Sequence, residues 1–325
     1  MPGKNPIAAV GSVRNFMNLV KEVNFDEIRD RAEQAPRILM VARDEAKAES
    51  ATDALFGEGT GGHVDLRVGD QADKIDTSRY DTVIVCDPDR SGIYDVVRKQ
   101  AMNGRTGNIF QLGSTGPEAV TNLRVAIVMA DPELAPAFGR WFVPFRGSAV
   151  HAIIDGTAKA NAKFAFVSNV PSIVPLFGGL ISASADLIVL TKNQVMMSYK
   201  LAAANGRDLS DQTGILRELA PVVGAGFVWR TVAREATSFL PFMAGTIPKV
   251  GIAFAGTYSV GLAVDYYYRF GKKPTKDQMR AFSQQAVKLA ASIPLPGRGA
   301  SNKQEAAIDA EIRASVEKAE KRPGE

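Results

Sequence analysis

The chain has 325 residues, of which 46% are hydrophobic and 23% charged, a composition typical of a folded protein long enough for two domains. Its single cysteine, Cys86, excludes a disulfide framework, and with only 2 histidines beside it no zinc-ligand spacing can be built. Residues 1–145 hold 17 Lys and Arg against 21 Asp and Glu, whereas residues 146–325 hold 22 against 14. This asymmetry predicts two units with different partners. On charge alone, nucleic acid and an anionic membrane surface are both candidate partners.

The first 35 residues predict an amphipathic helix. Apolar residues recur at steps of three and four, from Ile7 through Val13 and Phe16 to Val23. Packing on the following domain is the simpler interpretation, and a membrane anchor is the alternative. The segment lacks the continuous apolar core of a signal peptide, so we expect the N-terminal part to be cytoplasmic.

Residues 36–140 are expected to form an α/β domain with a mostly parallel, doubly wound sheet. Short β-rich runs alternate with segments compatible with helices, notably Ala46–Phe56 and Ile93–Asn103. The expected strands are Ile38–Val41, Val64–Val68, Thr82–Cys86, Asn108–Leu112 and Val125–Met129. In such sheets ligands bind beyond the carboxyl ends of the strands.

Two turns at predicted strand ends are candidate anion-binding sites, because glycine- and hydroxyl-bearing turns can hold anions with backbone N–H groups. Ordinary strand-to-helix turns, with an aspartate or a hydroxyl as the helix cap, are the simpler interpretation. The residues of this candidate rim are Asp87, Asp89, Ser91, Gly113, Ser114, Thr115 and Gly116. Cys86 closes the preceding strand and is interpreted as buried strand filler.

The segment Ile38–Gly57 has the outline of a phosphate-binding loop, with a strand, a short turn and a helix ending in "DALFG". A working loop needs G-x-x-x-x-G-K-[ST]. In the register set by "DALFG", the four positions that contact phosphate and Mg²⁺ hold Ala42, Lys47, Ala48 and Glu49. The lysine and the hydroxyl are thus replaced, and Asn-Lys-x-Asp is missing, so we expect a degenerate GTPase-like domain that binds neither GTP nor another cofactor.

Residues 141–292 are expected to form an all-α domain, followed by a linker and charged tail at residues 293–325. Helices are predicted at Gly147–Phe166, Asp186–Asn205 and Gln212–Phe239, and Asn205-Gly206 is a helix stop. Phe164–Ala185 is uncharged over 22 residues but contains two prolines.

The segments "DGTAKANAKFAFVSNVPSIVPLFGGLISASADLIVLTKNQVMMSYKLAAANGRDL" and "PKVGIAFAGTYSVGLAVDYYYRFGKKPT" carry a resemblance. They resemble the YcjF-like, GTPase-associated bacterial domain of unknown function, over roughly residues 146–282. The resemblance implies an Era-like GTPase domain in front of this one, and some members are thought to be membrane-embedded. It supplies no reaction and no catalytic residue.

Polar residues on the predicted helix Asp186–Asn205 are expected to form a network inside an otherwise apolar bundle. A structural network is the simpler interpretation, and an ion or proton path is the alternative if the bundle lies in lipid. The predicted members are Asp186, Lys192, Asn193, Gln194, Arg230 and Glu235.

The leading hypothesis from the sequence is a non-catalytic interaction protein at the inner face of a membrane. Its expected partners are an anionic lipid surface, a second copy of the chain or a GTPase, and no nucleic acid. Tyr266–Tyr268 with Arg269, Lys272 and Lys273 could anchor it at the interface, and a helix end with a solvated basic turn is the alternative interpretation of these residues. The alternative is an enzyme or sensor that binds a nucleotide or another anionic ligand at the rim.

Overall fold

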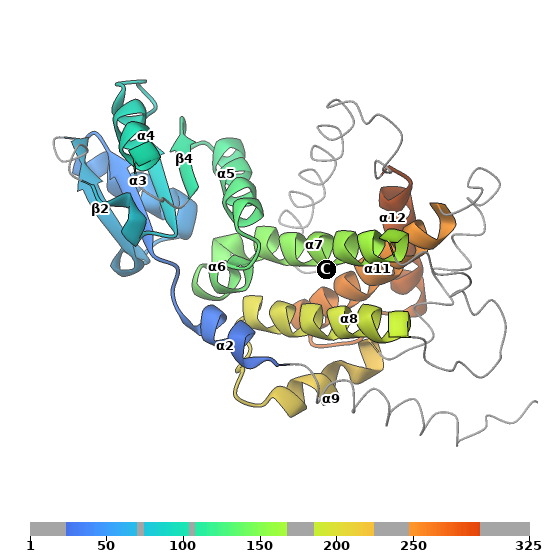
Figure 1. Cartoon of the computed structure of the whole chain (residues 1–325). Coiled ribbons are helices and arrows are strands. Elements are labelled where there is room, and N and C mark those ends of the chain that lie inside the picture. Colours follow the sequence, from blue (N-terminus) through green and yellow to red (C-terminus); the bar gives the residue numbers. More distant parts are fainter. Residues whose placement is uncertain (1–23, 70–74, 104–107, 168–184, 224–246, 293–325) are drawn as a thin grey trace, which may run out of the picture. The chain divides into compact units, whose positions relative to one another are not determined.

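The computed structural model describes residues 24–69, 75–103, 108–167, 185–223 and 247–292 (Figure 1). Most of the predicted N-terminal helix, most of Phe164–Ala185, the residues Arg230 and Glu235, and the linker and tail lie outside these ranges. The chain divides into two compact units. We call Asp30–Ala152 with Ala203–Gly206 the sheet unit, and the described parts of Met1–Arg29, Ile153–Ala202 and Arg207–Ala310 the helical unit.

The sheet unit contains a four-stranded sheet in which every neighbouring pair is parallel, in the order β2-β1-β3-β4. In chain order, the strands and helices from residue 26 to residue 141 are α2 (Asp26–Glu33), β1 (Ile38–Ala42), α3 (Glu45–Phe56), β2 (Val64–Val68), β3 (Thr82–Cys86), α4 (Ile93–Asn103), β4 (Asn108–Leu112), α5 (Pro117–Ala130) and α6 (Ala135–Trp141). Short 3₁₀ turns η1 (Gly61–His63), η3 (Thr77–Arg79) and η4 (Val143–Phe145) lie between them. The predicted α/β class and four of the five predicted strands are confirmed.

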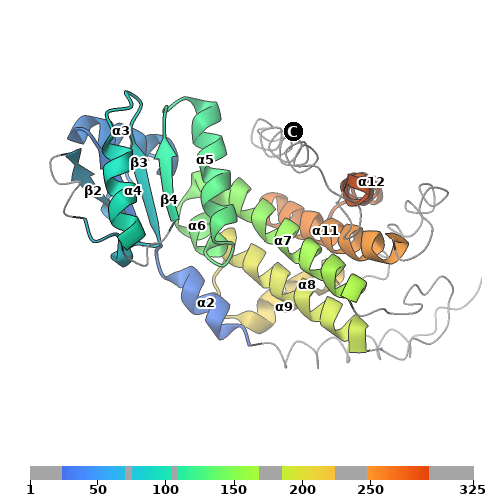
Figure 2. The ribbon, with the colours of Figure 1, turned by 45° about the horizontal axis from the view of Figure 1, so that its top comes forward.

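The two central strands are buried on both faces, which explains why they read as continuous apolar runs. Leu39, Val41, Val83 and Val85 form one cluster with Val97 of α4. Because side chains alternate along a strand, Met40 and Ile84 face the opposite side. Helix α3, which contacts β1, β2 and β3 as well as α5, covers that second face (Figure 2).

The fifth predicted strand, Val125–Met129, was wrong, because these residues belong to helix α5. The run is rich in β-branched residues, but the buried positions of this helix, Val120, Leu123, Ile127 and Val128, recur at helical spacing. Pro117 occupies the first turn, where a missing N–H costs nothing. The helical periodicity of the whole segment therefore outweighed the local β propensity of Val125–Met129.

The helical unit is built from α7 (Arg146–Val167), α8 (Ala185–Ala204), α9 (Gln212–Val223), α11 (Ile247–Phe270) and α12 (Lys276–Ser292). Helix α7 begins in the sheet unit, and the boundary falls after Ala152. The predicted helices at the positions of α7 and α8 are confirmed, and Gly206 ends α8 with a φ of 76°. Helix α11 packs against both α9 and α12.

Close packing of α7 against α11 depends on Gly261. A Cβ added at this glycine would lie 2.7 Å from Cγ1 and 2.8 Å from Cγ2 of Ile154. Ile154 is buried and branched at Cβ, so it cannot turn away at little cost. The close approach of these two helices therefore requires a residue without a side chain.

We expect Gly261→Ala to lower the free energy of unfolding by roughly 1–3 kcal/mol, because the added methyl group overpacks the contact with Ile154. The matched control is Gly156→Ala in α7, where an added Cβ meets nothing within 4 Å. That change should raise stability by up to about 1 kcal/mol, as alanine replaces glycine in a helix. Urea unfolding followed by circular dichroism measures both, and an equal gain for the two variants would contradict the packing argument.

Candidate functional site

The candidate site lies at the carboxyl ends of β1 and β3, which are neighbours in the sheet. From β1 the chain goes to β2 on one side, and β3 lies on the other side. This reversal of strand order is the place where open α/β sheets bind ligands. The turns that follow β1 and β3 therefore decide what the sheet unit can bind.

Only Arg43 and Asp44 separate β1 from α3. Asp44 is the N-cap, and its carboxylate accepts a hydrogen bond of 2.9 Å from the backbone N–H of Lys47. This is the ordinary role of an aspartate before a helix, and it explains why the helix begins here. The helix ends at Gly57, with a φ of 95°, whose N–H donates to the carbonyl of Asp53.

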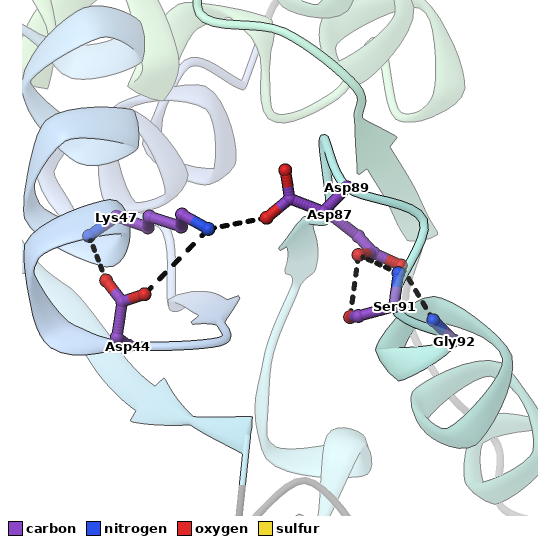
Figure 3. A network of polar contacts seen from close by, with 6 residues as sticks. All are labelled: Asp44, Lys47, Asp87, Asp89, Ser91 and Gly92. Carbon is purple, nitrogen blue, oxygen red and sulfur yellow. Dashed lines mark hydrogen bonds and ion pairs between the residues drawn. The ribbon is translucent and has the colours of Figure 1, made fainter.

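The four positions predicted to be a degenerate phosphate loop lie at the end of β1 and at the start of α3. Ala42 is the last residue of β1 and is buried, and Ala48 is a buried residue of α3. Glu49 is exposed in the next position of the helix. The side chain of Lys47 extends toward the turn after β3 (Figure 3).

Lys47 is held across the switch point by carboxylates. Its Nζ lies 2.6 Å from Oδ2 of Asp89, in the turn after β3, and 3.9 Å from Oδ2 of Asp44 (Figure 3). The hydrogen bond to Asp89 raises the pKa of Lys47, so the ammonium stays charged. The ammonium of Lys47 is therefore already paired.

Asp87 closes the turn from β3 into α4. Its Oδ1 accepts hydrogen bonds from the N–H and the hydroxyl of Ser91, at 2.7 and 2.8 Å, and its Oδ2 accepts from the N–H of Gly92 at 3.3 Å. Burial alone would raise the pKa of Asp87, but these hydrogen bonds outweigh it and lower the pKa. Arg90, in the same turn, takes a left-handed φ of 52°, which is uncommon for a residue other than glycine.

The third predicted part of the rim, Gly113–Gly116, stands apart from this network. The hydroxyl oxygen of Ser114 accepts from the N–H of Gly116 at 3.0 Å, and Thr115 is exposed. Gly116 is the N-cap of α5 and supplies no side-chain hydrogen bond. The structure thus links the turns after β1 and β3 by side chains, and leaves the turn after β4 outside that link.

Cys86, the last residue of β3, is buried, and burial is the main cause that raises the pKa of its thiol. A raised pKa keeps the thiol protonated and unreactive, as expected of strand filler. Within the described ranges, histidine, cysteine and acidic residues form no cluster of three that could hold a metal ion.

Asn193 and Gln194, two of the residues predicted for a polar network, make buried hydrogen bonds in the helical unit. The amide of Asn161 in α7 donates to the hydroxyl of Thr257 in α11 at 2.8 Å, and Asn193 of α8 donates to Oδ1 of Asn161 at 2.6 Å. Gln194 also donates to Thr257, at 3.3 Å. Asn161 and Thr257 are completely buried, and their hydrogen bonds join three helices.

Four predicted members do not take part in what the structure describes of this network. Lys192 is exposed, the side chain of Asp186 lies outside the described positions, and Arg230 and Glu235 lie in a segment that is not described. The alanine-rich composition of α7 gave no sign of Asn161, because a single asparagine can equally be a solvent-exposed residue. The capping role of Asp44 could have been predicted, because an aspartate directly before a helix is a start signal.

In the part of the chain that is described, no helix combines the length and the apolar composition that crossing a membrane requires.

Comparisons with protein-family models, with curated proteins and with solved structures find no match to this chain. The resemblance to the YcjF-like domain and the GTPase-like character of the sheet unit therefore stay predictions.

We expect Asp87→Asn to lower the free energy of unfolding by roughly 1–2 kcal/mol at pH 7, because hydrogen bonds to a charged acceptor are replaced by weaker ones. The pKa of Asp87 is lower in the folded chain than its unfolded value of about 4. The stabilisation is therefore complete above that value and is lost as the pH falls through the folded pKa. Unfolding titrations between pH 7 and pH 2 should show the gap between wild type and variant closing at the acidic end. Asp53→Asn, at an exposed position of α3, is the control, and a gap independent of pH would contradict the role of Asp87.

We expect Asn161→Ala to lower the free energy of unfolding by roughly 1–3 kcal/mol, because it removes the hydrogen bond that Thr257 accepts from Asn161 and leaves the amide of Asn193 without its partner. Ser198→Ala is the matched control, since that buried hydroxyl donates only to the carbonyl of Gln194 in its own helix. Chemical denaturation of the full chain measures both. Equal, small losses would mean that the network contributes nothing to the packing of the three helices.

Proposed function

We propose that the protein is a non-catalytic interaction protein, in which the sheet unit is a scaffold and the helical unit acts at a membrane surface or in self-assembly. One observation carries the proposal: the backbone N–H groups with which a switch point would hold a phosphate are bonded to the chain's own carboxylates. The N–H of Lys47 is bonded to Asp44. Those of Ser91 and Gly92 are bonded to Asp87.

The length of the β1–α3 connection supports the absence of nucleotide binding. A phosphate loop places four residues between its two glycines, so that several backbone N–H groups converge on one phosphate. Here the connection has two residues, Arg43 and Asp44, and the helix starts at once. The proposal describes the sheet unit as pseudo-GTPase-like in its strand–turn–helix outline, with the ligand-binding loop missing.

The charge at the switch point also disfavours phosphate. The carboxylates of Asp44 and Asp89 lie 3.9 and 2.6 Å from the ammonium of Lys47, and the carboxylate of Asp87 lies in the same turn as Asp89 (Figure 3). A nucleotide would have to displace the Lys47–Asp89 ion pair and then sit beside an unpaired carboxylate. Like charges at such short range cost several kcal/mol in a partly shielded site, on the order of the whole gain from one phosphate contact.

The partners expected of such a scaffold are an anionic membrane surface, a second copy of the chain or a GTPase, in the cytoplasm at the inner face of the membrane. The basic composition of residues 146–325, with 22 basic against 14 acidic residues, supports the first of these. No nucleic acid is proposed, because the basic residues are not interleaved with a recognised binding motif.

The rival proposal is an enzyme or sensor for a small anionic ligand, and one feature favours it. Gly113, Ser114 and Thr115 are exposed, and the first turn of α5 has no side-chain cap. An anion could bind there without displacing an existing ion pair. This alternative uses the turn after β4 and leaves the Lys47 network in place.

A ligand screen by thermal unfolding tests the two proposals. GTP, GDP and ATP with Mg²⁺, inorganic phosphate and phosphorylated sugars are each added at about 1 mM to the full chain. A ligand present at 100 times its dissociation constant stabilises a protein by about 2.7 kcal/mol, which is a shift of several degrees for a unit of this size. We expect no saturable shift.

The variants Lys47→Ala and Ser114→Ala assign any shift that does occur. A saturable shift with a nucleotide that Lys47→Ala abolishes would overturn the non-catalytic proposal. A shift that survives in Lys47→Ala but is lost in Ser114→Ala would establish the rival site.

A further inference from the structure

The turn between α11 and α12 presents a cluster of exposed cations. We call it the basic turn, and its members are Arg269, Phe270, Lys272, Lys273, Lys276 and Arg280, all of them exposed. From residue 269 to residue 280 the chain holds five basic residues and one acidic residue, Asp277. This is a net charge of +4 within twelve positions of one turn and the helix ends beside it.

The turn has a defined conformation. Gly271 takes a φ of 65° and donates its N–H to the carbonyl of Tyr267 at 2.8 Å, which ends α11. Thr275 and Gln278 form a reciprocal cap at the start of α12: the N–H of Thr275 donates to Oε1 of Gln278 at 2.8 Å, and the N–H of Gln278 donates to Oγ1 of Thr275 at 3.3 Å. The cations are therefore presented by a structured turn between two packed helices.

Aromatic contacts fix the base of the turn. The amide of Gln278 donates to the hydroxyl of Tyr266 at 2.8 Å, and the ring of Tyr266 lies 6.1 Å from that of Phe282 in α12. These contacts come from α11 and α12 and hold the two helix ends together. The outer side of the turn is left for the charged residues.

Phe270 adds an apolar side chain to this charged surface. It is 42% exposed, and among the described phenylalanines it alone is exposed. The guanidinium of Arg269 lies 5.5 Å from the centre of its ring, and the ring of Tyr266 lies 4.6 Å from it. An exposed phenylalanine among cations is the side-chain combination found where proteins meet a bilayer interface.

The lysines of the basic turn are not neutralised by the chain. In the described ranges, Lys272, Lys273 and Lys276 form no ion pair. Lys159 of α7, by contrast, is paired with Asp155 at 2.8 Å. Unpaired like charges held close together repel one another, and an anionic partner removes that repulsion.

We propose that the basic turn is the docking surface for an anionic lipid bilayer, with Phe270 inserted at the level of the headgroups. This inference rests on the membrane part of the proposed function and names the surface that performs it. Phosphates of duplex nucleic acid would also attract the cations, but a duplex offers no apolar layer for the exposed ring of Phe270. The bilayer is therefore the partner that uses both features.

The expected strength follows from the number of cations. Each lysine or arginine near an anionic membrane surface multiplies the partition coefficient by roughly five. Removing three of them should therefore weaken binding by roughly 100-fold. Removing the Phe270 ring alone should also weaken binding, without a change in charge.

The test is flotation of the full-length chain with vesicles of phosphatidylcholine alone or with about one third phosphatidylserine. Wild type should float with the anionic vesicles and stay in solution with the neutral ones. The triple variant Lys272→Gln, Lys273→Gln and Lys276→Gln should lose roughly 100-fold in partitioning, and Phe270→Ser should lose binding while keeping the charge. The matched control removes three exposed cations from the sheet unit, Arg79→Gln, Arg98→Gln and Lys99→Gln, and should bind as wild type does.

Each of the other outcomes would overturn a specific part of the proposal. If wild type floats and the lysine triple variant floats equally well, the basic turn is not the docking surface, although membrane binding stands. If wild type floats with neither vesicle, the membrane part of the proposed function fails together with this inference. Failure of both accompanied by lysine-dependent binding to a DNA duplex, measured by fluorescence anisotropy, would assign the turn to nucleic acid. Circular dichroism of every variant checks that it is folded.

Discussion

Two residues, Arg43 and Asp44, connect the central strand β1 to helix α3, and this short connection constrains everything the sheet unit can do at its switch point. A longer connection could turn several N–H groups toward one ligand. A connection of two residues lets the helix begin at once, and its first free N–H is taken by the aspartate that starts it. The same arrangement aims Lys47 across the strand ends, where Asp89 meets it. The polar groups of this rim consequently satisfy one another.

The helical unit is governed by a different constraint, which is how closely its helices approach. Gly261 lets α11 lie against Ile154 of α7, and at that short separation polar side chains from separate helices can reach each other. Asn161 and Thr257 use this to form a buried hydrogen bond of 2.8 Å. Because a misplaced helix would leave these groups unsatisfied, the network favours one arrangement of α7, α8 and α11 over alternatives.

The sequence predicted much of the fold, because four strands have short β-rich runs bounded by turn residues and the long helices have clear stops such as Gly206. It failed at Val125–Met129, where five apolar residues are compatible with a strand or a buried helix and only the longer periodicity decides. At the candidate site the rule on strand ends located the rim, but it could not say that Asp87 bonds the turn after β3 or that Lys47 meets Asp89. Those pairings depend on the register of two parallel strands, in which Ile38 pairs with Thr82 and Ala42 with Cys86, and no local pattern encodes this register.

Charge distribution separates surfaces that the chain has closed from surfaces that it has left for a partner. Where topology would place a ligand, the lysine is paired at 2.6 Å and the helix caps are occupied. In the basic turn, where the fold gives no reason for a binding site, three lysines are exposed without an ion pair in the described part of the chain. Self-repulsion of this kind raises the free energy of the isolated chain, and an anionic surface would relieve it. We therefore propose the basic turn, rather than the strand-end rim, as the place where this protein meets another molecule.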